Sequence, residues 1–191
     1  MNSKNEIKDK IEKGFLSTLK KEPFAKVKVV EIVKAAGISH QTFYRYYVDK
    51  YDLALKIATD KFSAFSIIYG SNATWKEIVV SILHSMKNCP ILFSRLLADP
   101  EGSEIILNSL IAISVIFTGA KSYEPNIAGW IRIFKEWSKN DFKTSIEDVY
   151  NQIRRSISVQ DVLTEEEIEK VMTVYENRRM EFFIAKASGK Q

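Results

Sequence analysis

Cysteine, histidine, glycine and proline are all scarce in this sequence. A single cysteine, Cys89, excludes an intrachain disulfide framework and is typical of a reducing compartment. The only histidines, His40 and His84, do not stand at the spacing of a zinc site with Cys89 or a carboxylate. With only 7 glycines and 4 prolines among 191 residues, the chain favours long helices over a turn-rich β fold.

Catalytic motifs are also absent. The sequence contains no glycine-rich phosphate loop, no nucleophile elbow and no paired-aspartate motif. The acidic run Glu165 to Glu167 follows Thr164 and is better explained as the capped first turn of a helix than as a metal site. His84 is best interpreted as an ordinary helix residue. We therefore expect no enzyme activity, no cofactor and no bound metal.

No apolar run is long enough to predict a membrane span. The most apolar stretch, Ile105 to Ala120, is short and is interrupted by Asn108, Ser109 and Ser114, so a buried helix is the better interpretation. The N-terminus shows no charged leader followed by an apolar stretch and a cleavage site. We expect a cytoplasmic protein with no membrane partner.

Apolar residues at helical spacing run through most of the chain and predict an all-α fold. Ile7, Ile11, Phe15 and Leu19 form one stripe of a first helix, which Glu22-Pro23 ends. The predicted helical segments are 3–20, 29–36, 39–47, a helix capped by Asp49, one opening with the capping box Thr74 to Glu77, then 90–97, 103–118, 130–137, 145–157 and 164–187. The clearest predicted loop is Gly119 to Asn126.

Positive charge is concentrated near the N-terminus. Residues 1–52 contain 11 Lys and Arg residues against 7 Asp and Glu residues, whereas residues 53–191 are balanced. The whole net charge of +4 therefore lies in the first quarter of the chain. Such a segment attracts an acidic partner such as nucleic acid, although many inert domains carry a similar charge.

Two short helices in this basic quarter have helix-turn-helix spacing. Val29 to Ala36 is followed by the turn Gly37-Ile38 and then by Ser39 to Tyr46. If Phe43 faces inward, the helical angle directs four neighbouring side chains outward: His40, Gln41, Tyr44 and Arg45. Side chains of these types can hydrogen-bond to base edges or to phosphate. On spacing alone, two ordinary packed helices joined by a glycine turn remain an equal alternative.

The stretch from Ile32 to Leu53, IVKAAGISHQTFYRYYVDKYDL, resembles the DNA-binding signature of TetR-type transcriptional regulators. In that family Ile-Ala-x-x-Ala-Gly-Val-Ser precedes Thr-Phe-Tyr-x-His-Phe-x-x-Lys-x-x-Leu, and the likeness covers about residues 7–60. Its details look most like the branch that includes dihydroxyacetone-kinase-type regulators. The resemblance implies a three-helix DNA-binding domain over residues 1–52 and a helical effector-sensing and dimerisation domain over 53–191.

Several DNA contacts follow from the resemblance by position. His40, Gln41 and Thr42 fall where the recognition helix reads bases, whereas Tyr44 and Lys50 fall on phosphate-binding positions. The complete predicted DNA-binding set is Lys28, Ser39, His40, Gln41, Thr42, Tyr44, Arg45, Tyr46 and Lys50, and the packing positions are Phe43, Tyr47 and Leu53. The sequence departs from the family at Lys28, which replaces a Ser or Thr cap, at Val33, which replaces a small Ala, and at Tyr46 and Tyr47, which replace His and Phe.

The resemblance also implies a homodimer on a palindromic double-stranded operator, most simply a repressor that answers a small-molecule effector. The dimer would close through Ser145 to Ile157 and Thr164 to Ala187, unless both apolar stripes are buried within one subunit. The aromatic segment Phe117 to Trp137 could line an effector pocket, but plain core is the better interpretation. Two alternatives stay open: a regulator controlled by a partner protein, and a helical interaction module without DNA specificity.

Overall fold

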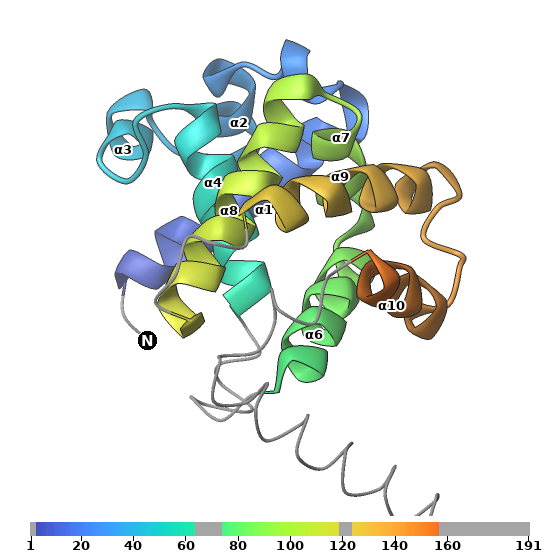
Figure 1. Cartoon of the computed structure of the whole chain (residues 1–191). Coiled ribbons are helices and arrows are strands. Elements are labelled where there is room, and N and C mark those ends of the chain that lie inside the picture. Colours follow the sequence, from blue (N-terminus) through green and yellow to red (C-terminus); the bar gives the residue numbers. More distant parts are fainter. Residues whose placement is uncertain (1–2, 64–73, 119–123, 157–191) are drawn as a thin grey trace, which may run out of the picture. The chain divides into compact units, whose positions relative to one another are not determined.

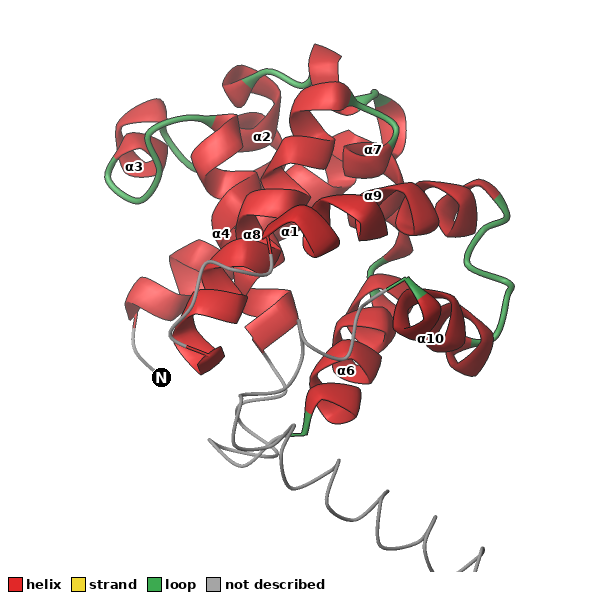
Figure 2. Ribbon diagram, viewed as in Figure 1, coloured by secondary structure: helices red, strands yellow, loops and turns green. Residues whose placement is uncertain are grey.

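The predicted apolar stripe of the first helix lies in the N-terminal core. Ile11, Phe15 and Leu19 are completely buried in α1 (Ser3–Lys21), and the helix ends directly before Glu22-Pro23 as expected. The computed structural model describes residues 3–63, 74–118 and 124–156, all of which belong to one unit spanning residues 1–156. Every regular element among these described residues is a helix, as Figures 1 and 2 show, and this confirms the all-α prediction.

One 3-10 helix and three α-helices follow α1 and complete the N-terminal part. A short 3-10 helix, η1 (Phe24–Lys26), leads into α2 (Val29–Ala36), then α3 (His40–Tyr44) and α4 (Lys50–Ser63). The remaining described helices are α6 (Trp75–Asn88), α7 (Pro90–Leu97), α8 (Pro100–Thr118), α9 (Glu124–Lys139) and α10 (Ile146–Arg155). α1 packs along α2, and α4 packs along α8, so α4 connects the N-terminal helices to the rest of the unit. The predicted domain boundary at 52/53 falls inside α4 and stays a prediction.

Capping residues define the helix ends where the sequence predicted them. Asp49 Oδ1 accepts the backbone N–H groups of Tyr51 and Asp52, both at 2.8 Å, and so opens α4. Thr74 and Glu77 form the predicted capping box, in which the Glu77 carboxylate accepts the Thr74 N–H at 2.8 Å. These local hydrogen bonds explain why short sequence patterns located the starts of α4 and α6 correctly.

Several predicted helix boundaries were wrong. α8 begins at Pro100 rather than at Ser103, and α9 spans Glu124–Lys139 rather than 130–137. The third helix ends at Tyr44 rather than at Tyr46 or Tyr47, because the chain turns there with the N–H groups of residues 46 and 47 both donating to Phe43 O. The predicted loop Gly119 to Asn126 is also too long, since α9 already begins at Glu124. Pro125 at the second position of α9 needs no intrahelical donor, so the proline that indicated a loop is compatible with a first helical turn.

The aromatic residues of α9 belong to the core, as the better of the two interpretations held. Trp130, Phe134 and Trp137 are all buried, and the Trp137 ring lies edge-on to Phe142 at a centroid distance of 5.0 Å. Between α4 and α7, Phe62 and Phe93 stack at 4.9 Å. Stacked and edge-on pairs of this kind add about 0.5–1.5 kcal/mol beyond the area they bury. The side chains of Phe117 and Tyr123 lie outside the described residues.

None of the described helices combines the length and the apolar character that crossing a membrane requires. Among the described residues there is also no group of three or more His, Cys, Asp or Glu side chains arranged to hold a metal ion. His84 is exposed on α6. The predicted dimer helix Thr164 to Ala187 and the capping box at its start lie outside the described residues.

Gly14 permits the close contact between α1 and α2, which gives a first prediction. A Cβ atom at this position would lie 2.8 Å from Ile32 O and 2.9 Å from both Cβ and N of Ala36. Because two of these atoms are backbone, Gly14→Ala should lower the free energy of unfolding by about 1–3 kcal/mol, measured by urea denaturation. In the matched control Gly129→Ala, the new Cβ atom meets no atom within 4 Å at an exposed position of α9, so this change should raise the free energy of unfolding by about 0.5–1 kcal/mol. A stabilised Gly14 variant would contradict the tight α1–α2 packing.

Candidate nucleic-acid interface

The turn between α2 and α3 has the geometry that the helix-turn-helix spacing predicted. Gly37 adopts φ +64° and ψ +38°, a left-handed conformation that costs glycine little and strains most other residues. Its N–H donates to Lys34 O at 3.3 Å, and the Ile38 N–H donates to Val33 O at 3.1 Å. The last turn of α2 is thereby closed, and α3 begins at a fixed angle to it.

Ser39 starts α3 as a side-chain cap. Its Oγ accepts the backbone N–H of Thr42 at 3.1 Å and lies 2.9 Å from the Thr42 hydroxyl. One of the helix's free N–H groups is therefore satisfied, which is worth about 1 kcal/mol. Both hydroxyl groups make these bonds within the protein, so Ser39 and Thr42 present fewer free donors to a ligand than His40 or Gln41.

The aromatic side chains of this region are buried or exposed according to their position around the helix, as the sequence predicted. Phe43 is completely buried, and Tyr47 is 6% exposed beside it with ring centroids 5.8 Å apart. Burial raises the pKa of Tyr47 to about 12, assisted by the nearby carboxylates of Asp60 and Glu12, so this phenol stays neutral. Leu53 is buried as well. The three predicted packing positions are confirmed.

The outward side of α3 carries the predicted base-reading and phosphate-binding types. His40, Gln41, Tyr44 and Arg45 are exposed, and the Tyr44 side chain is 56% exposed. The His40 and Tyr44 rings lie one helical turn apart and face each other at 29°, with centroids 6.5 Å apart. Figure 1 shows α3 at the periphery beside α2 and the beginning of α4, with its outer face uncovered by other described helices.

Lys28 and Lys50, both predicted DNA contacts, have different surroundings. Lys28 is exposed at the cap position of α2. Its side chain does not cap the helix, as expected where Lys replaces a Ser or Thr. The Glu31 carboxylate instead accepts the Lys28 backbone N–H at 3.1 Å. The Lys50 ammonium donates to Phe24 O at 2.9 Å and Ala25 O at 3.0 Å, and it lies 4.9 Å from the centre of the Phe24 ring. Lys50 therefore stabilises η1, and one of its three N–H donors is left for a further acceptor.

The segment after α3 is held by a lysine–aspartate pair. Lys56 Nζ lies 2.9 Å from Asp52 Oδ2 and reaches the backbone oxygen of Tyr46 at 3.4 Å. Asp52 also accepts the Val48 N–H at 2.9 Å. Burial by itself would raise the pKa of Asp52, but the hydrogen bonds from Val48 and Lys56 hold it below its ordinary value. These contacts fix the backbone of half-buried Tyr46 next to α3.

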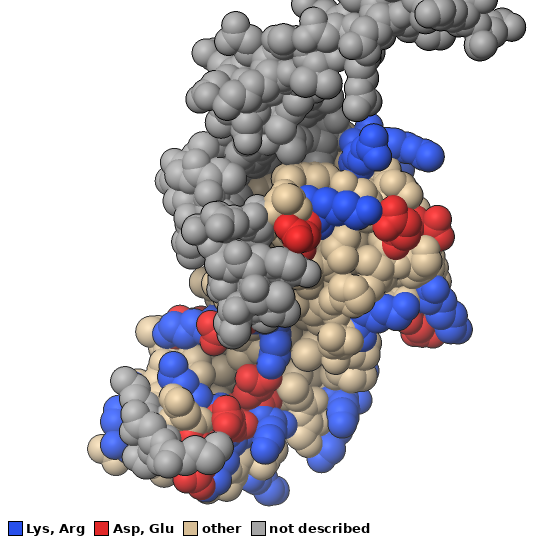
Figure 3. Space-filling model, turned by 90° about the horizontal axis from the view of Figure 1, so that it is seen from below, with Lys and Arg blue, Asp and Glu red and all other residues tan. Residues whose placement is uncertain are grey.

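Charges on the face seen in Figure 3 are mixed rather than segregated. On the face drawn in Figure 3, Lys and Arg side chains alternate with Asp and Glu side chains over the described residues. An electrostatic attraction to nucleic acid therefore depends on the excess of cations in residues 1–52 and on the exposed residues of α2 and α3.

Residues 16–57 match the family model described as bacterial regulatory proteins of the tetR family. The match spans α1 from Leu16, the helix-turn-helix with its Gly37 turn, and the first half of α4. This part of the chain is therefore similar to the N-terminal domain of tetR-family regulators. Regulators of this family are DNA-binding transcriptional regulators, and the all-helical arrangement of the described residues agrees with their fold.

One solved structure shows a similar fold over most of the chain. The dihydroxyacetone kinase operon activator DhaS has a TM-score of 0.52 and 19% identity, with 78% of this chain and 92% of that one covered. A TetR transcriptional regulator from Rhodococcus sp. RHA1 has a TM-score of 0.49 and 16% identity, covering 77% and 92%. No curated protein matches the sequence. At these identities the likeness to DhaS shows a shared fold.

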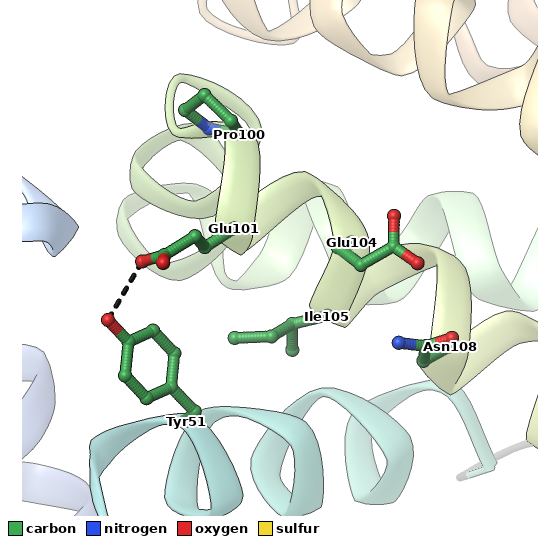
Figure 4. Close-up of a pocket in the computed structure, with 6 residues that line it drawn as sticks. All are labelled: Tyr51, Pro100, Glu101, Glu104, Ile105 and Asn108. Atoms are coloured by element: carbon green, nitrogen blue, oxygen red, sulfur yellow. Dashed lines mark hydrogen bonds between the residues drawn. The ribbon is translucent and has the colours of Figure 1, made fainter.

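One contact beside the tetR-type domain was not predicted. The Tyr51 hydroxyl donates to Glu101 Oε2 at 2.8 Å, and a groove of about 460 Å³, open to solvent, lies between Tyr51 and the first three turns of α8 (Figure 4). Its lining residues are Tyr51, Pro100, Glu101, Glu104, Ile105 and Asn108. The partners of the hydrogen bond are 50 residues apart, so no local spacing rule could have paired them.

The two contacts of Lys50 give a second prediction. Lys50→Met keeps the apolar stem but removes the ammonium from the Phe24 and Ala25 carbonyls, so the free energy of unfolding should fall by about 1 kcal/mol. If the remaining N–H donor binds phosphate, the slope of log K against log salt should also fall by about 1. Urea denaturation and a salt titration on DNA measure the two effects. A destabilised variant with an unchanged slope would restrict Lys50 to holding η1.

Proposed function

We propose that this protein is a sequence-specific transcriptional regulator that binds a palindromic operator as a homodimer. The observation that carries the proposal is the division of α3: Phe43 anchors the helix in the core while His40, Gln41, Tyr44 and Arg45 remain exposed on its outer side. Gln can pair with adenine through two hydrogen bonds, and Arg with guanine, so these side chains suit the major groove. Two such helices, one from each subunit, would enter successive major grooves about 34–36 Å apart.

The nine residues predicted from the resemblance divide into roles in this proposal. His40 and Gln41 contact bases, with Thr42 beside them. Phosphates are contacted by Lys28, Tyr44, Tyr46 and Lys50. Arg45 reaches either a base edge or a phosphate, and Ser39 shapes the helix start. Phosphate contacts supply affinity and depend steeply on salt, whereas base contacts supply the preference for one sequence.

Repression is the proposed mode, because a bound dimer needs only to occupy its operator to exclude polymerase. The helices from residue 53 onward would sense a small-molecule effector and change the separation of the two recognition helices. A coupling of about 1–3 kcal/mol between effector and operator would change DNA affinity roughly 5–150-fold. DhaS is by its name an operon activator, but that is a property of DhaS, and the shared fold does not fix the sign of regulation.

Selection of bound sequences from random double-stranded DNA tests the proposal. The full chain should enrich a palindrome whose half-sites are one helical turn apart, and affinity for it should exceed that for scrambled DNA by about 10³-fold or more at physiological salt. Sedimentation of the complex should give two protein chains for each operator. Enrichment of no palindrome, with binding that only follows salt, would favour a basic interaction module; an operator bound equally with and without metabolite extracts but released by a protein would favour control by a partner protein.

A further inference from the structure

The first turn of α8 is joined to the first turn of α4 by one side-chain hydrogen bond. Tyr51 on α4 donates its phenolic proton to Glu101 on α8 over 2.8 Å, and Figure 4 shows the two side chains pointing toward each other across the end of the groove. The bond to the Glu101 carboxylate raises the pKa of Tyr51, with smaller effects of burial and of nearby acids. The phenol therefore remains a hydrogen-bond donor throughout the physiological pH range.

Tyr51 also touches the turn that precedes α2. Its ring lies edge-on to Phe24 of η1, with centroids 5.6 Å apart and planes at 86°. The Lys50 ammonium lies 5.0 Å from the centre of the Tyr51 ring and donates to the carbonyls of Phe24 and Ala25. Phe24 is completely buried and packs edge-on against Phe15 of α1 at 6.3 Å. A side chain held by α8 is therefore in direct contact with the residues that fix the start of α2.

We propose that the Tyr51–Glu101 hydrogen bond is a latch through which α8 holds η1, and with it the helix-turn-helix, in the orientation seen here. When the latch is closed, Glu101 keeps the Tyr51 ring against Phe24. When it is open, the ring, already 37% exposed, is free to rotate about its own side-chain bonds toward solvent, and Phe24 and Lys50 lose one neighbour. The latch is a positioning device: neither residue belongs to the proposed DNA-binding set.

Gly102 makes α8 a stiff support for the latch. A Cβ atom at Gly102 would collide with the backbone oxygen and Cα of Leu96, so the first turn of α8 lies directly against the end of α7. Ser103 adds hydrogen bonds to Leu97 O at 3.2 Å and to Asp99 O at 2.8 Å. Glu101 is on this rigid turn and not on a flexible loop. Any shift of α8 therefore moves the Glu101 carboxylate by the same amount.

A double-mutant cycle tests the latch. Tyr51→Phe and Glu101→Ala should each lower affinity for the selected operator about three- to tenfold, the range expected for loss of one hydrogen bond to a charged group at a partly exposed site. The double variant should be no weaker than the weaker single variant, because both changes break the same bond. Glu101→Gln should bind within about twofold of the unaltered protein, since the amide oxygen still accepts the phenolic proton. Glu104→Gln, one turn along α8, is the matched control for loss of charge.

The effect of the latch on DNA affinity rests on the proposed function. Hydrogen exchange measured without DNA tests the latch independently of that function. Without DNA, amides of residues 24–36 should exchange about three- to tenfold faster in Tyr51→Phe and Glu101→Ala than in the unaltered chain or in Glu104→Gln. If no operator is found, the proposed function fails, and faster exchange in these two variants would still support the latch. Unchanged exchange in both variants, additive losses in the cycle, or a Glu101→Gln variant as weak as Glu101→Ala would overturn it.

Discussion

Replacing Phe43 with alanine is expected to lower the free energy of unfolding by about 3–5 kcal/mol, the usual cost of removing a buried aromatic ring. Phe43 is completely buried, and its ring contacts those of Tyr44 and Tyr47 at centroid distances of 5.4 and 5.8 Å. A helix of five residues is far too short to be stable by itself, so packing of this ring is what retains α3. Urea denaturation followed by circular dichroism measures the loss, and specific DNA binding should disappear with it.

The neighbouring residue supplies the control. Tyr44→Ala removes an aromatic ring that is more than half exposed, so the free energy of unfolding should change by less than about 1 kcal/mol while operator affinity falls. Comparing the Phe43→Ala and Tyr44→Ala variants therefore distinguishes a loss of folding stability from a loss of DNA contact at two adjacent positions. A Phe43→Ala variant as stable as the unaltered protein would mean that the cap at Ser39 and the turn at Gly37 hold α3 without its core anchor.

Replacing Gln41 with alanine should cost about 1–3 kcal/mol of operator binding, a five- to 150-fold loss, with unchanged protein stability. Gln41 is exposed at the second position of α3, one residue after His40, where its amide has no packing role. An amide that pairs with one adenine supplies discrimination at that base alone. The variant should therefore tolerate any base at one operator position, which repeated selection from random DNA would read out.

The appropriate comparison for Gln41 is an exposed amide outside the proposed DNA-binding and dimer surfaces. Asn88 is exposed at the end of α6, and Asn88→Ala should leave both operator affinity and sequence preference unchanged. Binding of the two variants to scrambled DNA should also be equal, because nonspecific affinity comes from phosphate contacts. If Gln41→Ala lost the same affinity for cognate and scrambled DNA, its role would be contact with the backbone rather than base reading.

Local rules determined most of the helix-turn-helix in advance. Gly37 adopts the left-handed turn conformation, Ser39 caps α3, and the burial of Phe43 and Tyr47 against the exposure of His40 and Gln41 follows from helical phase. Each of these depends on residues within one or two turns of each other, so the sequence contains all the information needed. The end of α3 was predicted two or three residues too late, because the chain turns after Tyr44, where the N–H groups of residues 46 and 47 both donate to Phe43 O.

Contacts between distant residues were decided only by the tertiary structure. The family resemblance assigned the Lys50 ammonium to phosphate, but its position over η1 depends on how the start of α4 packs against Phe24, 26 residues earlier. Arg95 on α7 donates to Leu19 O in the last turn of α1 at 3.0 Å, and Tyr51 reaches Glu101; no periodicity links these pairs. The sequence by itself determined the helices, their caps and the outer face of α3, since hydrophobic period and capping act over a few residues. The contacts of those helices with α7 and α8 depend on packing across the whole unit. This packing sets the relative orientation of the helices, which no short stretch of sequence encodes.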